Sequence, residues 1–491
     1  GTAGNRSNDN SGNEVNGVIS NGLAGSVAVN VSTANNQNGV WKFTNANNSY
    51  TGATTVGTGT LIFTSIVNSG VNSSIGAGNA IIMGSGVHLK YAGPSASTDR
   101  AISGNGSFYN VGSGTTLTLT GTVTLGFTFR GSGNFDIISV LTGGSGVSRT
   151  DSGTVLLSNN ANSFSGNISI SDGAFRGATL FNSGVNSAFG RGTTISFGQG
   201  SSTVGRVEYT GITTSTNRLL VMRNDTAGNT GRGVIDVTTA GETLTFTNGV
   251  RTAANATAAR VANIAELTLR GAGNGEIQGQ IGGTTTETAA VVALKLVKSG
   301  AGTWTLSGAN TYARETTVSA GILNIQHSSA LGQVMSNETV STAAGAGTTV
   351  ASGASLQLQN NISVGAEALS LAGNGATGQN GVLVNVSGTN SFAGAITLTA
   401  NSTLASDSGR LNLTSATGIN GNAASRTLAL AGAGEGSITA GLGANISTLT
   451  KNGTGLWTLA GTNDHTGATT VNAGTLNVTG SCTGTGNETV D

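Results

Sequence analysis

The sequence is poor in cysteine, proline, histidine and charge, and each shortage excludes a class of protein. One cysteine, Cys482, allows neither an internal disulfide framework nor a cysteine metal cluster. One proline excludes collagen and proline-rich linkers. Charged residues make up 9% of the chain, and 21 basic side chains balance 21 acidic ones, so no basic patch for phosphates is evident. No apolar run approaches the roughly 20 residues of a membrane helix. We therefore expect no nucleic-acid partner and no membrane-spanning segment in this chain.

Glycine and alternating, strand-like stretches are what the chain has in quantity. It contains 80 glycines in 491 residues. Threonine or serine alternates with Leu, Val or Ile in stretches such as TTLTLTGTVTL (115–125) and ETLTFTNG (242–249). Alternation puts every second side chain on one face, which is typical of a strand. Clusters of Asn, Gly, Ser and Asp, which favour turns, separate these stretches. The sequence predicts an all-β protein with short strands.

Five segments of the chain resemble one another, and they share two aromatic positions. The segments are residues 39–63, 153–175, 302–325, 387–404 and 453–478. The first shared position, here called the tryptophan position, holds all three tryptophans of the chain and one valine: Trp41, Val155, Trp304 and Trp457. The second, the aromatic position, follows eight or nine residues later and holds Tyr50, Phe164, Tyr312, Phe392 and His465. We interpret both sets as structural repeat positions.

Repeats of this size become stable by stacking on their neighbours around a common core. A propeller needs evenly spaced blades, whereas successive tryptophan positions here lie 114, 149 and 153 residues apart. A solenoid accepts whole inserted coils, and a right-handed crossover is the default for parallel strands. We therefore predict a right-handed parallel β-helix, a single continuous β-solenoid over residues 1–491 with a less regular segment at about 200–290. At roughly 20 to 25 residues a coil, it would contain roughly 20 coils.

Two of the segments carry a family resemblance. GTWTLSGANTYARETTVSAGILNI (302–325) and GTGLWTLAGTNDHTGATTVNAGTLNV (453–478) resemble the autotransporter-associated β-strand repeat of bacterial passenger domains and related surface proteins. The resemblance implies export through a Gram-negative envelope to an extracellular or cell-surface location. It also implies a right-handed β-helix with a role in adhesion, aggregation or surface structure. The motif specifies a scaffold and not a reaction.

No group of residues in the sequence predicts a catalytic, metal or cofactor site. The three histidines, His88, His327 and His465, have no partner at ligand spacing. The densest charged group, formed by Asp225, Asp236, Glu242, Arg223 and Arg232, is most simply read as solvated turns. The tryptophans could stack on sugars, but their place in alternating TWTL and LWTL favours core packing. We expect a protein that is not an enzyme and needs no cofactor.

Three functions stay open from the sequence. The first is an extracellular structural protein that self-associates with identical copies into fibres or a sheath, because neither end of the repeat array resembles a cap. The second is an adhesin stalk that binds glycans or other cells through loops in the 200–290 segment. The third is a polysaccharide lyase or hydrolase, which would need paired carboxylates or a calcium-and-arginine arrangement on adjacent coils.

Overall fold

The protein folds into two compact units, residues Gly1–Arg218 and Leu219–Asp491. The computed structural model describes residues 13–22, 25–32, 39–124, 126–198, 203–223, 231–253, 264–284, 293–333, 347–423, 425–483 and 488–490. The described residues contain strands, turns and bends and no helix that could cross a membrane. Each unit is described by itself.

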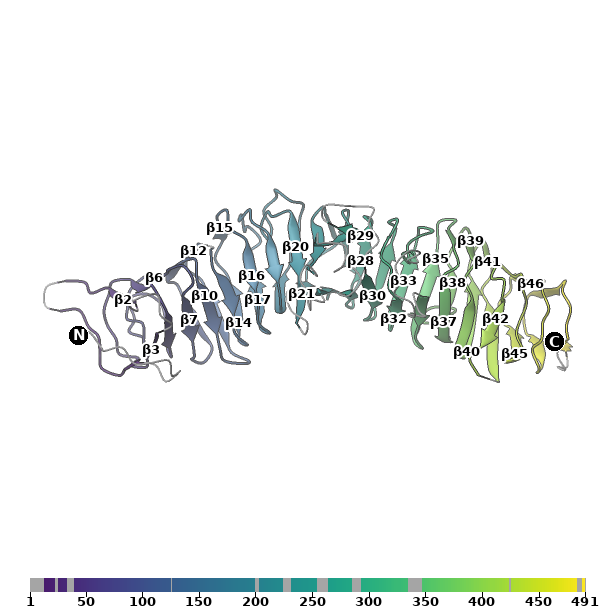
Figure 1. Ribbon diagram of the computed structural model, residues 1–491, viewed down its shortest axis with the longest axis horizontal. Coiled ribbons are helices and arrows are strands. Elements are labelled where there is room, and N and C mark those ends of the chain that lie inside the picture. Colours follow the sequence, from purple (N-terminus) through teal and green to yellow (C-terminus); the bar gives the residue numbers. More distant parts are fainter. Residues whose placement is uncertain are drawn as a thin grey trace. The chain divides into compact units, whose positions relative to one another are not determined.

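The strands of both units pair in parallel, which confirms the predicted all-β parallel β-helix. Within each unit they lie side by side in long rows (Figure 1). The alternating sequence explains this arrangement, because one face of each strand is apolar and is buried against the other rows. The right-handed sense, the number of coils and the continuity from residue 1 to 491 stay predictions.

The N-terminal unit contains three parallel sheets. The first contains β1 (Asn13–Val15), β3 (Val40–Phe43), β5 (Thr60–Phe63), β7 (His88–Tyr91), β10 (Ser107–Asn110), β13 (Thr128–Arg130), β16 (Val147–Arg149), β18 (Ile168–Ile170) and β20 (Thr194–Phe197). The second contains β8 (Ala96–Thr98), β11 (Thr116–Leu119), β14 (Asn134–Ile137), β17 (Thr154–Leu157), β19 (Gly173–Gly177) and β21 (Val204–Tyr209). The third contains β2 (Val29–Val31), β4 (Thr54–Val56), β6 (Ala80–Met83), β9 (Ala101–Gly104), β12 (Val123–Thr124) and β15 (Leu141–Thr142).

The C-terminal unit continues the same construction in four rows. The first row contains β23 (Leu219–Met222), β26 (Val250–Thr252) and β29 (Ile281–Thr284). The second and longest row contains β24 (Arg232–Val237), β27 (Ala265–Arg270), β30 (Leu294–Lys298), β32 (Thr316–Val318), β34 (Gly347–Val350), β37 (Ala368–Gly373), β40 (Ile396–Ser406), β43 (Arg426–Ala431), β45 (Ile446–Lys451), β47 (Thr469–Val471) and β49 (Glu488–Val490). The third row contains β25 (Thr243–Phe246), β28 (Asn274–Ile277), β31 (Thr303–Leu306), β33 (Gly321–Ile325), β35 (Ala354–Leu358) and β38 (Leu383–Asn385), and the fourth contains β36 (Ser363–Val364), β39 (Thr389–Phe392), β41 (Arg410–Leu413), β44 (Glu435–Ile438), β46 (Leu456–Leu459) and β48 (Thr475–Val478). The segment from 200 to 290, expected to be less regular, contains several of these strands.

Between β7 and β13 of the N-terminal unit, one coil takes about 20 residues. His88 of β7 is the register partner of Ser107 in β10, and Ser107 is the partner of Thr128 in β13, so the offsets are 107 − 88 = 19 and 128 − 107 = 21 residues. The chain visits the three sheets in a fixed order from β7 to β15, with one strand in each. Because each turn returns to the same register, equivalent side chains stack in rows along the sheet.

The interior is formed by apolar side chains at alternate strand positions. In β11 and β14 the burial alternates strictly, with Leu117, Leu119, Phe135 and Ile137 almost completely buried. Phenylalanine rings cluster on these rows, with the centroids of Phe129 and Phe135 4.9 Å apart in an edge-on arrangement. The core therefore runs along the stacked coils, and the outward faces of the strands are mostly polar.

Candidate functional site: the repeat positions and the charged outer face

The tryptophan position lies in the core and faces a glycine of the preceding strand. Trp304 and Trp457 are completely buried. Their register partners are Gly275 and Gly436. A Cβ atom added at Gly275 would lie 2.5 Å from the indole ring of Trp304, and one at Gly436 would lie 2.4 Å from that of Trp457. The glycines provide the space for the rings, which are closed to a sugar in this fold.

The other two members of this position fit their neighbours by size. Val155 is fully buried between two larger register partners, Phe135 and Phe175. Trp41 is partly exposed and pairs with Asn13 and Leu61. At the three fully buried members, a small residue thus meets a large ring across the contact with the preceding coil, as close packing requires.

The aromatic position is also buried, and its chemistry matches the residue four places later. Tyr50, Phe164, Tyr312, Phe392 and His465 are between 0% and 6% exposed. The polar rings contact a threonine hydroxyl at 2.7 Å in each of the pairs Tyr50–Thr54, Tyr312–Thr316 and His465–Thr469. The two phenylalanines are instead followed by isoleucine, in the pairs Phe164–Ile168 and Phe392–Ile396. A buried hydroxyl thus occurs where the ring offers it a partner.

This matching predicts a recoverable loss of stability. Tyr312→Phe leaves the buried Thr316 hydroxyl without its phenol partner, which costs about 1–2 kcal/mol of the free energy of unfolding. Adding Thr316→Ile reproduces the Phe164–Ile168 pair and is expected to restore most of that loss. Urea unfolding of the two variants measures the difference. Thr317→Ile, at the neighbouring outward position, is the control. A double variant less stable than Tyr312→Phe would contradict the pairing.

A buried asparagine precedes the aromatic position by two residues in all five segments, and sequence reasoning missed it. In three of the segments its side-chain amide bridges the coils on either side. Asn310 accepts a hydrogen bond from the Ile281 amide at 2.7 Å and donates to the Ala330 carbonyl at 2.6 Å. Asn48 and Asn162 make the same two bonds to equivalent backbone groups. The recurring signal was the triplet Asn-x-aromatic: NSY, NSF, NTY, NSF and NDH.

Buried cations form a second hidden feature of the repeat. Arg149, Lys298 and Lys451 lie six residues before Val155, Trp304 and Trp457, and all three cations are completely buried. Lys298 Nζ donates to the carbonyls of Ser299, Gly300 and Ala320 at 2.8–3.0 Å. Burial lowers the pKa of Lys298 to about 8. These cations hold the carbonyls of glycine turns, so their role is structural.

Two more buried arginines close similar loops in the N-terminal unit. Arg100 donates to the carbonyls of Val67, Gly76 and Gly78, in the loop NSGVNSSIGAG (68–78) and the residue before it. Arg218 binds the loop NSGVNSAFGRG (182–192) in the same way. Each arginine ends a Ser-Thr-x-Arg sequence, STDR (97–100) or STNR (215–218), so the internal duplication extends well past the segments recognised from sequence.

One partly buried carboxyl group, that of Glu367, is expected to make the stability of the C-terminal unit depend on pH. Burial raises the pKa of Glu367 to about 7, while a hydrogen bond from Thr348 at 3.0 Å partly opposes the shift. Between the unfolded pKa of about 4.5 and pH 7, the folded state binds more protons. The free energy of unfolding should therefore fall as pH rises through this window, by at most about 3 kcal/mol.

Glu367→Gln is expected to remove this pH dependence and to be the more stable protein above pH 7. Urea unfolding at pH 4.5 and pH 8 tests it, with Glu435→Gln as the control, because the Glu435 side chain is 56% exposed. Identical pH slopes for wild type and Glu367→Gln would show that Glu367 does not carry the effect.

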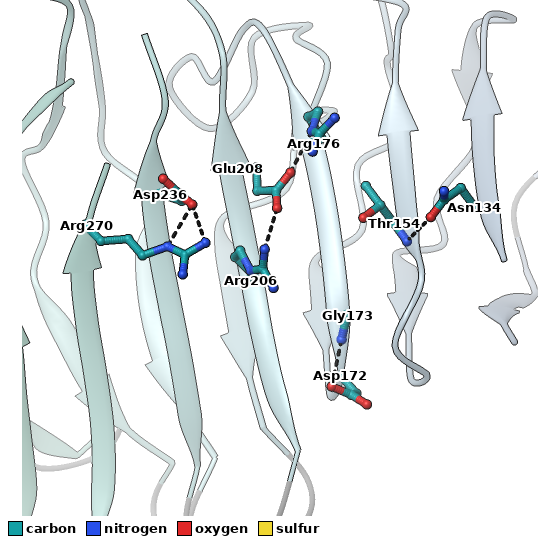
Figure 2. A network of polar contacts seen from close by, with 9 residues as sticks. All are labelled: Asn134, Thr154, Asp172, Gly173, Arg176, Arg206, Glu208, Asp236 and Arg270. Carbon is teal, nitrogen blue, oxygen red and sulfur yellow. Dashed lines mark hydrogen bonds and ion pairs between the residues drawn. The ribbon is translucent and has the colours of Figure 1, made fainter. Parts of the chain in front are cut away.

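Ion pairs run across the outward face of the second sheet of the N-terminal unit. Glu208 is held between Arg176, 2.6 Å away on the adjacent strand, and Arg206, 2.7 Å away on its own strand (Figure 2). Only 6% of the Glu208 side chain is exposed. Arg176 and Glu208 are direct register partners in β19 and β21. The two guanidinium groups fully compensate this carboxylate.

Two of the charged residues that the sequence analysis grouped together, Asp236 and Arg232, pair with residues outside that group. Asp236 pairs with its register partner Arg270 at 2.6 Å (Figure 2). Arg232 pairs with Glu266 at 3.3 Å, and Glu266 also contacts Lys295 at 3.8 Å. Asp225 lies outside the described residues. In the part of the chain that the structure describes, no three potential metal ligands come together.

The comparisons with known proteins agree with the repeated geometry. The passenger-associated-transport-repeat family matches residues 37–63, 148–176, 296–325 and 449–478. Each match contains one residue of the tryptophan position, and the last three contain the buried cation. The chain is an autotransporter-passenger-like repeat protein. The matching family is a passenger repeat and not an enzyme family. The shorter segment at 387–404 is not among the matches.

A relative of this passenger-like chain is an adhesin. The Adhesin BmaC autotransporter of Brucella suis biovar 1 (strain 1330) is 33% identical over 140 residues, which cover 27% of this chain and 4% of the relative. The matched part thus spans a small fraction of that protein's length. No solved structure matches the chain.

Proposed function

We propose that this passenger-like chain is a non-catalytic, adhesive segment exposed at the surface of a Gram-negative bacterium. Its similarity to a named autotransporter adhesin is the single observation that carries the proposal. The fold supports it, because polar positions that recur at every coil give a long surface for repeated weak contacts. In the described residues, Asp236 is engaged in an ion pair with Arg270, and no three potential metal ligands come together, which does not favour a lyase or hydrolase.

Bead adhesion tests this proposal directly. Latex beads coated with the purified chain should adhere to host epithelial cells or to neighbouring bacteria above the level of beads coated with heat-unfolded chain. An antibody against the chain should label intact producing cells, and external protease should remove the label. Beads that adhere no better than the unfolded control would overturn the adhesive function. Release of products from acidic polysaccharides, with or without calcium, would overturn its non-catalytic part.

Self-association of identical copies is the second candidate function. Large apolar side chains on the flank of the N-terminal unit favour it: Phe181 is 37%, Val185 49% and Ile212 74% exposed. Exposed apolar groups of this kind mark surfaces that bury area against a partner. Sedimentation velocity should show oligomers of the wild-type chain, and Phe181→Ser with Ile212→Ser should shift them to monomer. A wild-type chain that stays monomeric at high concentration would remove this candidate.

A further inference from the structure

The outward face of the first sheet in the N-terminal unit carries a row of cationic and aromatic side chains. In that row Lys90 of β7, Tyr109 of β10 and Arg130 of β13 are successive register partners. Two further residues extend it, because Ile62 of β5 is the partner of Lys90 and Lys42 of β3 is the partner of Ile62. We call the row, together with the adjacent His88, the Tyr109 strip: Lys42, Ile62, His88, Lys90, Tyr109 and Arg130.

Contacts within the Tyr109 strip hold its centre in one arrangement. Lys90 Nζ lies 5.1 Å and Arg130 Cζ 5.2 Å from the centroid of the Tyr109 ring, within cation–π range. Arg130 donates a hydrogen bond to the Tyr109 hydroxyl at 2.9 Å. The same hydroxyl lies 3.2 Å from His88 Nδ1. We assign the Tyr109 hydroxyl as the donor to Nδ1, which leaves the imidazole proton on Nε2.

The charges of the Tyr109 strip are compensated at its two ends and not in its middle. At one end Lys42 lies 3.9 Å from Glu14, and at the other Arg130 lies 3.6 Å from Asp151. Among the described residues, no carboxylate lies within ion-pair distance of Lys90. The centre of the strip thus combines an ammonium group without a counter-charge with the Nε2–H donor of His88. A single carboxylate or sulfate group would satisfy both.

The spacing of the cations restricts the kind of anionic partner. Lys42, Lys90 and Arg130 lie on every second strand of the sheet, in the order β3, β5, β7, β10, β13. With strands about 4.8 Å apart, neighbouring cations are spaced by about 10 Å. That distance is close to the length of one disaccharide in an extended glycan. A nucleic-acid strand carries a phosphate about every 3.4 Å and would leave most of its charges unmatched.

We propose that the Tyr109 strip binds a linear acidic polysaccharide that carries one anionic group per disaccharide. The glycan runs along the sheet, across the strands, and places one anionic group on Lys90 and His88. The next groups along the glycan meet Arg130 on one side and Lys42 on the other. This inference rests on the proposed adhesive function for its biological setting, and it supplies the chemistry of the partner.

Titration of the purified chain with hyaluronan oligosaccharides, which carry one carboxylate per disaccharide, tests the proposal. We expect binding that weakens with added salt and a Kd at least tenfold higher for Lys90→Gln. Lys42→Gln, at the end of the strip, should weaken binding less. Arg410→Gln, an exposed arginine of the C-terminal unit, is the matched control and should leave the Kd unchanged. Circular dichroism confirms that the variants fold.

Three outcomes would overturn the proposal: equal binding of neutral dextran, an unchanged Kd for Lys90→Gln, or tighter binding of single-stranded DNA that depends on Lys90. The bead assay separates this inference from the proposed function. If the wild-type chain adheres to cells but does not bind hyaluronan, only the inference about the Tyr109 strip is removed. Hyaluronan binding through Lys90 by a chain that does not adhere to cells removes only the adhesive function.

Discussion

Replacing Trp304 by alanine is expected to lower the free energy of unfolding of the C-terminal unit by about 3–5 kcal/mol. The indole ring is completely buried and covers the bare backbone of Gly275 on the adjacent strand. Truncation removes the apolar contacts and leaves a cavity that the neighbouring strands cannot close, because their backbones are fixed by the parallel ladder. Urea unfolding of the whole chain measures the loss. Far-UV circular dichroism is the probe, because the backbone signal does not depend on the fluorescence of the removed tryptophan.

Exchanging the small and the large residue of this register pair should preserve much of the stability that Trp304→Ala loses. At the equivalent position of the N-terminal unit, the large residue Phe135 is the register partner of the smaller Val155. Gly275→Phe combined with Trp304→Val copies this pair and should be more stable than Gly275→Phe alone, which forces two large rings together. Thr305→Ala, on the outward side of the same strand, is the control and should change stability by less than about 0.5 kcal/mol. If Gly275→Phe alone were as stable as wild type, size matching across the coils would be wrong.

Asn310→Leu is expected to cost about 2–5 kcal/mol, although the substitution keeps the number and branching of the side-chain heavy atoms. In this buried site the Ile281 amide loses its partner, and the Ala330 carbonyl keeps only the long hydrogen bond from the Tyr312 hydroxyl at 3.5 Å. Each unpaired buried group costs about 1–3 kcal/mol. Urea unfolding measures the sum, and hydrogen exchange at the Ile281 amide should accelerate as a local sign of the broken bridge.

The control for this prediction is an asparagine of the same unit that lies on the surface. Asn472 is exposed and donates only to the side chain of Asn452, at 2.8 Å. Asn472→Leu should leave the free energy of unfolding within about 0.5 kcal/mol of wild type. Equal effects of Asn310→Leu and Asn472→Leu would mean that the bridge does not stabilise the stacked coils.

The bridging asparagines and buried cations explain how a chain with few charges tolerates so many turns. Each coil must satisfy the carbonyls of its own corners, because successive corners stack and exclude water. A side chain with several N–H donors, such as Lys298 or Arg218, satisfies a group of carbonyls without a counter-ion. The carbonyl-rich corner thereby replaces the carboxylate that such a cation usually needs.

The strands and their stacking were predictable from the sequence because they depend on a local pattern. Alternation of apolar and polar residues, as in TLTL, buries every second side chain whatever lies beyond it. The recurrence of tryptophan and of a second aromatic residue indicated that equivalent positions occur in several coils. These signals were sufficient for an all-β parallel β-helix and for the family resemblance.

The polar interior was not predictable in the same way. Lysine and asparagine, as in Lys298 and Asn310, usually lie on the protein surface. Sequence analysis without knowledge of the neighbouring coils therefore places them there. Their repeated offset from the tryptophan and aromatic positions was visible. The reason for it was not visible, because the partners that connect Lys298 and Asn310 to other coils lie about 20 to 30 residues away in the sequence.

By itself, then, the sequence determined which residues face inward and that the coils would be parallel, since both follow from alternation and repetition along the chain. Only the tertiary structure decided which side chains meet across the coils. It paired Trp304 with Gly275, and it placed Lys90, Tyr109 and Arg130 in one outward row. The physical reason is that register between coils depends on the length of every intervening turn, so residues about 20 positions apart become neighbours only after the coils have formed.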